Sequence, residues 1–266
     1  AALVQNGVTA SGDTSDIASI GSLFYEPLAI YCYGKQPLMR LYALRGGRIG
    51  IGAAGSGTRV LALAPLGAND IDASNADLEP LEGNATMDAL IAHRVNATFL
   101  SAEPATVANF RTLMQAPNVH LLSFEYPEPY LLRFRYLSKL TISAAAFDIG
   151  ADPPRHDVTL LASTVRLLVH FGTSPEPVDL LIQAAQKING RGPLLEKPGE
   201  FPAALRHSWP FSDEAVRYYK SGRTFLYRVL PFWLASLISC LWVMIVPLVV
   251  VVIPALQFAP TSTAGA

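Results

Sequence analysis

The feature that most constrains this 266-residue chain is its apolar C-terminal end. From Val229 to Ala266 there is no Asp, Glu, Lys or Arg, and the stretch Phe232–Phe258 is apolar almost throughout. A helix needs about 20 such residues to cross a bilayer. Trp233 lies near one end of the stretch, where membrane helices place interfacial aromatic residues. We therefore predict a transmembrane helix over 229–258. The alternative is a long helix buried in a soluble core.

The orientation of this segment stays open from the residues alone. Four basic residues shortly precede it: Arg217, Lys220, Arg223 and Arg228. The positive-inside rule would place 1–228 in the cytoplasm, but large domains translocate largely regardless of charge. The chain begins AALVQNGV, which is not a secretory signal peptide. We expect a longer natural chain that was processed or truncated before Ala1.

Composition excludes several classes of protein. The formal net charge is −1, without the basic excess that nucleic-acid-binding chains usually show, so we expect no nucleic-acid partner. Charged residues make up only 15% of the chain, and the mean hydropathy is +0.31, so the chain is not intrinsically disordered. The two cysteines, Cys32 and Cys240, do not form a disulfide framework.

Before the apolar end, strand and helix patterns alternate. The predicted strands are Ala2–Val4, Ile17–Leu23, Phe24–Tyr33, Arg48–Gly52, Ala97–Leu100, Val119–Phe124 and one or two within Asp157–Phe171. The predicted helices are Thr58–Asn69 (interrupted at Pro65), Met87–Val95, Glu103–Gln115 and Pro175–Asn189, the last with an apolar face of Leu180, Leu181, Ala184, Ala185 and Ile188. This alternation favours a largely parallel sheet with helices on its faces. Pro27 marks an edge or crossover position of its strand.

The segment GRIGIGAAGSGTRVLAL (Gly47–Leu63) is the strongest candidate for ligand chemistry. It combines a strand, a loop of small residues and a helix start. Ser56, Gly57 and Thr58 fall where the first helical N–H groups are free, and such a helix end binds anions. Arg59 adds a possible bidentate contact with a carboxylate. The alternative is an ordinary capped turn with a solvated arginine.

Other chemistry is not indicated. Gly50, Gly52 and Gly55 spell a GxGxxG pattern, but the first two lie inside the predicted strand, which is the wrong register for a dinucleotide site. The five histidines have no metal-ligand spacing, and neither HExxH nor GxSxG occurs. We therefore predict no catalytic residue, no metal site and no cofactor. Glu26 is either a site residue or the cap of a local turn.

Five segments together resemble a known family. They are ALVQNGV (Ala2–Val8), SLFYEPLAIYCY (Ser22–Tyr33), LRGGRIGIGAAGSGTR (Leu44–Arg59), DVTLLAST (Asp157–Thr164) and YYKSGRTFLYRVLPFWLA (Tyr218–Ala235). In this order they resemble the TAXI family of TRAP-transporter solute receptors, in the subgroup with a C-terminal membrane helix. The GSGTR loop and the YEPL run are the most specific parts.

The resemblance implies an α/β fold of the type 2 periplasmic binding protein kind. Two lobes, joined by two crossing strands, would enclose a ligand. The first lobe would comprise 1–30 and 161–222, the second 31–160, and the membrane helix 229–258. The family normally begins with a strand and a glycine-rich loop about 70–90 residues before ALVQ. The first lobe is therefore expected to be incomplete.

The resemblance also implies a function. It is that of a membrane-tethered, periplasmic-side solute receptor, rather than an enzyme, whose ligand is a small carboxylate such as an amino acid or dicarboxylate. Its partners would be a TRAP-type membrane permease and the lipid bilayer. Ser56, Gly57, Thr58 and Arg59 match the family's anion-binding loop. Tyr25 and Glu26 fall at the crossover, and Gln5 and Asn6 match a loop that faces the cleft, with Asn6 where a glycine is common.

Two other functions remain open at this point. The first loop is either cut off because the chain is a fragment or lost in this member, and a sensor or scaffold protein with a degenerate cleft would fit such a loss together with the membrane tether. A membrane-anchored enzyme would use the same scaffold, since a fold does not settle a function. It would need a nucleophile and base in the cleft, and the sequence shows no such pair.

Overall fold

The computed structural model describes residues 1–8, 15–101, 112–147, 150, 154–190, 195–205, 209–222 and 241. The chain divides into two compact units, Ala1–Val216 and Arg217–Ala266. The first unit contains the sheet. Its architecture is mixed α/β, with one eight-stranded sheet and helices packed against it.

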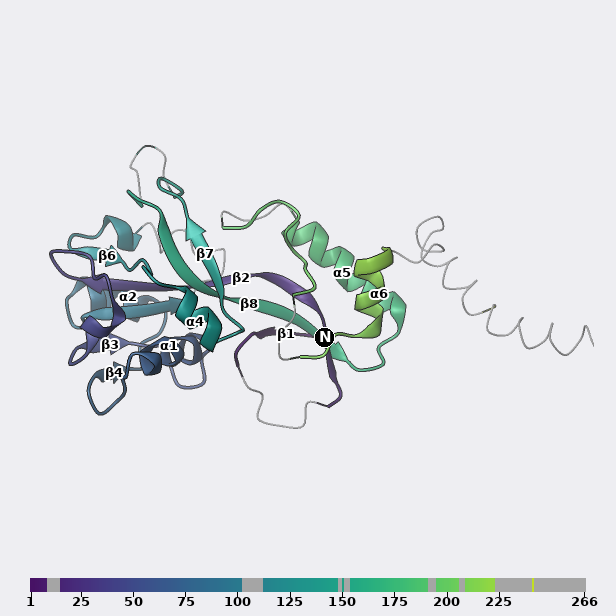
Figure 1. Ribbon diagram of the computed structural model, residues 1–266, viewed down its shortest axis with the longest axis horizontal. Coiled ribbons are helices and arrows are strands. Elements are labelled where there is room, and N and C mark those ends of the chain that lie inside the picture. The colour runs from purple at the N-terminus through teal and green to yellow at the C-terminus, as the bar shows by residue number, and fades with distance from the viewer. Residues whose placement is uncertain are drawn as a thin grey trace, which may run out of the picture. The chain divides into compact units, whose positions relative to one another are not determined.

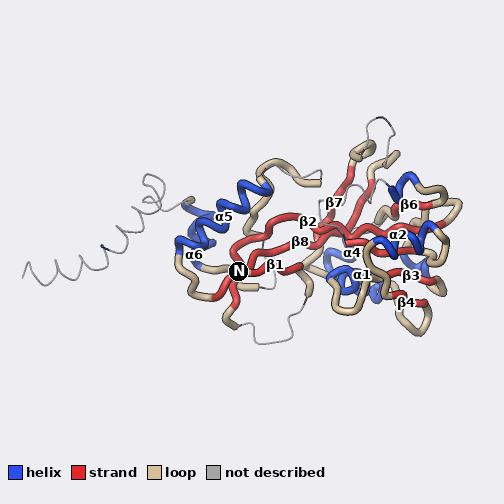
Figure 2. The backbone as a smooth tube through the Cα atoms, turned by 180° about the vertical axis from the view of Figure 1, so that it is seen from behind, coloured by secondary structure: helices blue, strands red, loops and turns tan. Residues whose placement is uncertain are grey.

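Two long antiparallel strands organise the sheet. β2 (Ile17–Tyr33) and β8 (Val158–His170) pair with each other from Ile17 opposite His170 to Leu28 opposite Leu161. Figures 1 and 2 show them side by side from opposite directions. The pairing is irregular in two places, between Ser19 and Gly21 and between Ser22 and Phe24. The two predicted runs of 17–23 and 24–33 are thus a single strand.

The other strands join this pair on either side. They are β1 (Ala2–Gln5), β3 (Arg48–Gly50), β4 (Asp77–Glu79), β5 (Ala97–Ser101), β6 (Val119–Leu121) and β7 (Ser138–Ile142). The order is β1-β8-β2-β5-β3-β4, with β6 on β2 and β7 on β8. Among the named strands of the described residues, the parallel pairs are those of β3 with β4 and with β5. The prediction of a largely parallel sheet is therefore wrong, because the long β2 and β8 pair antiparallel with each other and with β1, β5, β6 and β7.

Pro27 lies in β2 at a point where the sheet tolerates it. It pairs with Ala162 of β8, while the ladder between β2 and β5 begins at the next residue, Leu28. A proline lacks the N–H that a central strand position normally donates. Because Pro27 lies just before the ladder between β2 and β5 begins, that ladder loses no N–H donor.

The helices are α1 (Gly57–Ala68), α2 (Asn84–Ile91), α4 (Glu128–Arg133), α5 (Pro175–Asn189) and α6 (Asp213–Ser221), and η1 (Leu41–Leu44) is a short 3₁₀ turn. α1 runs through Pro65, so the interruption predicted there is wrong. The predicted helix 103–115 lies mostly outside the described residues, of which 112–115 are helical.

Both faces of β2 are buried, which explains its continuous apolar run. Leu28 and Ile30 share a cluster of buried residues with Leu61 of α1. Ala29 belongs to a second cluster with Leu90 of α2. Since neighbouring side chains of a strand point to opposite faces, α1 and α2 cover opposite faces of this part of the sheet.

α5 has the predicted bounds but a different buried face. Its buried residues are Val178, Asp179, Ile182 and Ala185. Leu180 is 44% exposed and Ile188 is 77% exposed, so both lie outside the packed face. Val178, Ile182 and Ala185 follow the spacing of one helical stripe. The sequence contains two overlapping apolar stripes, and the sheet packs against the less obvious one.

The apolar stretch 232–258 lies outside the described residues except for Leu241. Within the described residues, no helix is both long enough and apolar enough to span a membrane.

Candidate functional site

The N-terminus of α1 is fixed by Ser56 and by a glycine. The Ser56 hydroxyl accepts the Arg59 N–H at 3.2 Å and donates to the Ala53 carbonyl oxygen at 2.8 Å. Gly52, at φ +89°, lies against this cap, and a Cβ there would come within 2.8 Å of the Ser56 hydroxyl. The small residues of the loop are therefore required by the packing of the helix start.

This helix start offers donors without acceptors. Among the described residues, no hydrogen bond uses the N–H of Gly57 or Thr58. The Arg59 guanidinium lies over the loop, with Nη1 3.5 Å from the Gly52 carbonyl oxygen. Ser56, Gly57, Thr58 and Arg59 are all partly exposed. The helix dipole adds a partial positive charge at this end. The arrangement can bind an anion.

Gln5 of β1 lies directly at this helix start. A Cβ on Gly57 would overlap the Gln5 side-chain oxygen, so only glycine leaves room for the glutamine. The Gln5 Nε2 is buried and has no hydrogen-bond partner. Asn6 follows, 1% exposed, and neither its side-chain oxygen nor its nitrogen has a partner. Buried amides normally form hydrogen bonds, so these two side chains carry donors and an acceptor that the protein itself leaves unused.

Glu26 lies on the same face of the sheet as α1. It is two residues from Leu28, which packs in the α1 cluster, and strand side chains alternate between faces. Its carboxylate accepts a hydrogen bond from the Ser101 hydroxyl. On β8, Glu26 pairs with Ser163, whose hydroxyl donates to the Asn6 carbonyl oxygen at 2.7 Å. These contacts connect Glu26 to the Gln5–Asn6 end of β1.

Tyr25 lies on the opposite face, away from Glu26. Its N–H donates to Glu196 at 2.8 Å and its hydroxyl to Glu200 at 3.1 Å. The Phe201 ring stands edge-on to it at 4.8 Å between centroids. Burial, and then the Glu200 carboxylate, raises the pKa of Tyr25 to about 12. The structure therefore separates Tyr25 from the other predicted site residues.

The Glu196 carboxyl is electrostatically unusual. Burial raises its pKa to about 7, against the lowering effect of the Tyr25 N–H, and the nearby Glu200 charge raises it further. Its second oxygen, Oε2, is buried without a hydrogen-bond partner. Sequence reasoning missed Glu196 and Glu200, because nothing local in LLEKPGEF indicates that they reach β2. Ser163, which contacts Asn6, did carry a local signal, because it is a polar residue within an otherwise apolar strand.

Replacing Ser56 with alanine is expected to lower the free energy of unfolding by about 0.5–2 kcal/mol, the usual cost of losing an N-terminal cap. The substitution leaves the Arg59 N–H without its acceptor and the loop without the bond to Ala53. Urea denaturation measures the change. Threonine at position 56 is the control, because it keeps the hydroxyl. An equal decrease in the free energy of unfolding in the alanine and threonine variants would contradict the capping role of Ser56.

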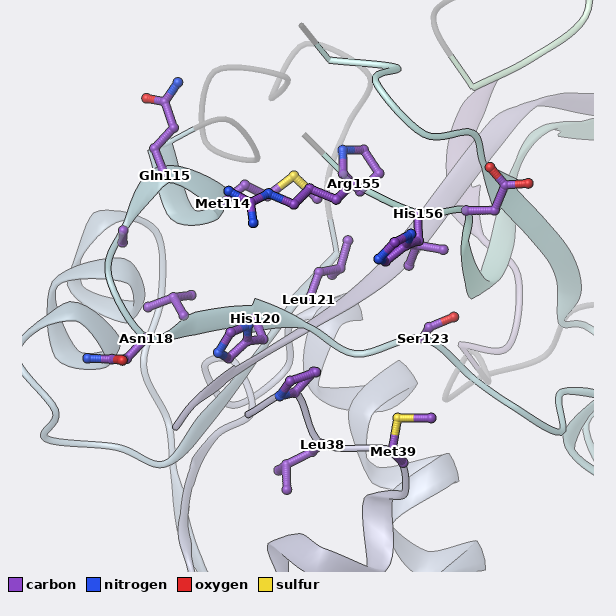
Figure 3. A pocket seen from close by; sticks show the side chains of 16 residues that line it. Leu38, Met39, Met114, Gln115, Asn118, His120, Leu121, Ser123, Arg155 and His156 are labelled. Atoms are coloured by element: carbon purple, nitrogen blue, oxygen red, sulfur yellow. The ribbon is translucent and has the colours of Figure 1, made fainter. Parts of the chain in front are cut away.

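A separate cavity lies beside β6, away from these residues. It has a volume of about 680 Å³, and its lining includes His120, Leu121, Arg155 and His156. In Figure 3, Leu121 and His156 point into the cavity. His120 Nε2 is 2.9 Å from the Gly34 carbonyl oxygen. None of the sequence-predicted site residues lines this cavity.

Within the part of the chain that the structure describes, no three His, Cys, Asp or Glu side chains are grouped so as to hold a metal ion. Cys32 is buried and unpaired, and burial raises the pKa of its thiol to about 12, so it is not a reactive thiolate.

The described residues thus form a mixed α/β fold with unbonded donors at the start of α1. Comparison with family models places the chain more narrowly. Residues 2–221 match the NMT1-like family, and the chain belongs to that family. A comparison with curated proteins finds no significant match.

Several solved structures are similar at low identity. A TctC solute binding protein from Polaromonas is 20% identical, with a TM-score of 0.42, and the match covers 70% of this chain and 59% of that one. The periplasmic aliphatic sulphonate binding protein SsuA from Escherichia coli is 13% identical, with a TM-score of 0.34 and coverages of 66% and 44%. The BenM effector binding domain with benzoate is 12% identical, with a TM-score of 0.40 and coverages of 77% and 75%. The chain thus spans less than two thirds of the first two proteins.

Proposed function

We propose that this chain is the ligand-binding part of a solute receptor of a TRAP-type transport system, of the TAXI kind, on the extracytoplasmic side of a membrane. The ligand is a small carboxylate, such as an amino acid or dicarboxylate. The observation that carries this proposal is the N-terminus of α1, where the unbonded N–H groups of Gly57 and Thr58 adjoin the unpartnered Gln5 amide. Membership of the NMT1-like family supports it.

The proposed ligand contacts follow from the donors. The carboxylate accepts from the N–H groups of Gly57 and Thr58 and from the Arg59 guanidinium, which moves from the Gly52 carbonyl oxygen to reach it. Gln5 Nε2 supplies a further donor from β1. Glu26, on the same face, accepts from a ligand amine if the ligand is an amino acid.

The proposed organisation has two lobes, 1–30 with 161–222 and 31–160, sharing β2 and β8. The pairing of these two strands over most of their length supports that division. The apolar, charge-free stretch 229–258 supports a membrane tether. Transport would require a separate permease, because one helix forms no pathway.

Calorimetric titration of the folded protein with a panel of amino acids and dicarboxylates tests the proposal. At least one carboxylate is expected to bind, and Arg59→Ala is expected to weaken its binding by about tenfold to a hundredfold, since a hydrogen bond to a charged group contributes about 1.5–3 kcal/mol. Arg48→Ala is the matched control, because Arg48 is exposed on β3 and lies outside the loop. An affinity unchanged by Arg59→Ala would refute the assigned role. Failure of every carboxylate to bind would refute the ligand class.

A further inference from the structure

Another cavity lies between η1, α4 and the end of α1, and it shares no residue with the proposed solute site. Its volume is about 640 Å³, and its lining comes from the segments 39–42, 68–69 and 122–133. Figures 1 and 2 both show α4 beside α1. Small-molecule sites in proteins usually have volumes of about 300–1,000 Å³, so this cavity is large enough to hold a ligand.

The lining of this cavity is apolar below and aromatic at its rim. The buried part consists of three apolar side chains: Leu41, Leu122 and Phe124. At the rim, Met39, Tyr42 and Tyr126 are 57–60% exposed. Large exposed apolar side chains that gather around one hollow are typical of a binding site. Because aromatic rings and methionine sulfur both make favourable contacts with rings, this rim favours an aromatic ligand.

The Tyr130 hydroxyl, which also lines the cavity, has a proton to donate. The Asn69 side-chain nitrogen donates to the Pro65 carbonyl oxygen at 2.8 Å and to the Tyr130 oxygen at 2.7 Å. The Tyr130 oxygen therefore accepts from Asn69, and its own proton points elsewhere. Among the described residues, no recorded hydrogen bond uses this proton. An acceptor on a ligand in the cavity can take it.

The charges of the lining favour an acid over an amine. The charged residues that line the cavity are Arg40, Arg133 and Glu125, all exposed. The ion pair recorded among the described residues joins Lys139 and Glu128, so it neutralises none of the three. Two positive charges and one negative charge leave an excess of one positive charge around the cavity, which attracts an anion.

The C-terminal end of α1 does not reverse this preference. A helix end carries partial negative charge because its last four carbonyl oxygens lack partners within the helix. Here the Pro65 carbonyl oxygen accepts from the Asn69 side chain, and those of Leu66 and Gly67 accept backbone N–H groups. Three of the last four carbonyl oxygens of α1 are therefore already bonded, which leaves little to attract a cation.

We propose that this cavity is a second ligand site, which binds a small aromatic carboxylate. The ring of the ligand lies against Tyr42 and Tyr126, and its carboxylate accepts from the Tyr130 hydroxyl and pairs with Arg133. The site is separate from the carboxylate site at the start of α1. Gly57 and Ala68, at the two ends of this helix, are roughly 16 Å apart along its axis, given the rise per residue of an α-helix.

Calorimetric titration with phenylacetate tests the site, and two other ligands serve as matched controls. Phenylacetate is expected to bind. Phenethylamine has the same ring with the opposite charge, and cyclohexylacetate has the same charge with a saturated ring, so both are expected to bind several-fold more weakly. Failure of phenylacetate to bind, or equal affinity for either control ligand, would overturn the proposal.

Variants of the lining locate the bound phenylacetate. Tyr130→Phe keeps the ring and removes the donor, so it is expected to weaken binding about tenfold. Arg133→Gln is expected to weaken binding several-fold, whereas Arg135→Gln, at an exposed position outside the lining, is expected to leave it unchanged. If Tyr130→Phe fails to fold, the exposed Tyr126→Ala replaces it, with a several-fold loss expected. Unchanged binding in Arg133→Gln or in the tyrosine variant would overturn the site.

Arg59→Ala separates this site from the proposed solute site. Phenylacetate binding is expected to be the same in Arg59→Ala as in the wild type, because Arg59 does not line this cavity. Loss of phenylacetate binding in Arg59→Ala, with none in Arg133→Gln, would place the ligand at the start of α1 and overturn the second site, while supporting the proposed function. Binding of phenylacetate that depends on Arg133, together with failure of every amino acid and dicarboxylate, would support the second site and refute the proposed solute.

Discussion

Gly52→Ala is expected to lower the free energy of unfolding by about 2–3 kcal/mol, the combined cost of a left-handed backbone and local crowding. Gly52 has φ +89°, and its added Cβ would lie 2.8 Å from the Ser56 hydroxyl and 3.1 Å from the Arg59 backbone nitrogen. These two atoms form the cap of α1. Carboxylate binding is therefore expected to weaken together with stability, in urea denaturation and calorimetry respectively.

Gly55→Ala provides the matched control for this experiment. Gly55 has φ +83°, nearly the same backbone conformation, but no atom lies within 4 Å of its would-be Cβ. Gly55→Ala is expected to lower the free energy of unfolding by the backbone component alone, about 1–2 kcal/mol. The difference in the free energy of unfolding between Gly52→Ala and Gly55→Ala then gives the cost of crowding the α1 cap. Equal losses would show that Gly52 serves backbone conformation alone.

Glu196→Gln is expected to stabilise the protein at neutral and alkaline pH. The folded carboxyl has a pKa of about 7, above its ordinary value of 4.5, so the folded state holds the proton more tightly. Wild-type stability therefore falls as pH rises from about 4.5 to about 7 and then levels off. The shift corresponds to at most about 3 kcal/mol, which solvent screening reduces to about 2 kcal/mol.

Unfolding measured across this pH range compares the two proteins. They are expected to be similar at pH about 4.5 and to diverge up to pH about 7, because glutamine keeps an acceptor for the Tyr25 N–H without a charge. Glu82→Gln, at an exposed position of the same residue type, is the control and is expected to show no such divergence. Parallel curves for wild type and Glu196→Gln would mean that the Glu196 carboxyl is not perturbed.

Local patterns predicted the elements better than their pairing. The turn residues and apolar runs located β3, α1, β5 and α5 to within a few residues, because capping and periodicity are local properties. The antiparallel arrangement depends on β2 and β8, which lie more than a hundred residues apart in the chain. β7 was missed, because the polar–apolar alternation of Lys139–Ile142 is too short to stand out as a strand.

The candidate site shows the same limit. The GSGTR segment was found because a helix start with small residues is a local signal, and the structure adds Gln5 to it through packing on Gly57. Tyr25 and Glu26 were predicted together, yet strand alternation sends them to opposite faces.

The pairing of β2 with β8 has a mechanical consequence. Two strands that run together from Ile17 to Leu28 form a continuous ribbon, with no loop along it to serve as a swivel. Any rotation of one end of the sheet against the other must then be taken up as torsion of this ribbon. The irregular pairing at Ser19–Phe24 is where that torsion meets least resistance, because bulges already interrupt the ladder there.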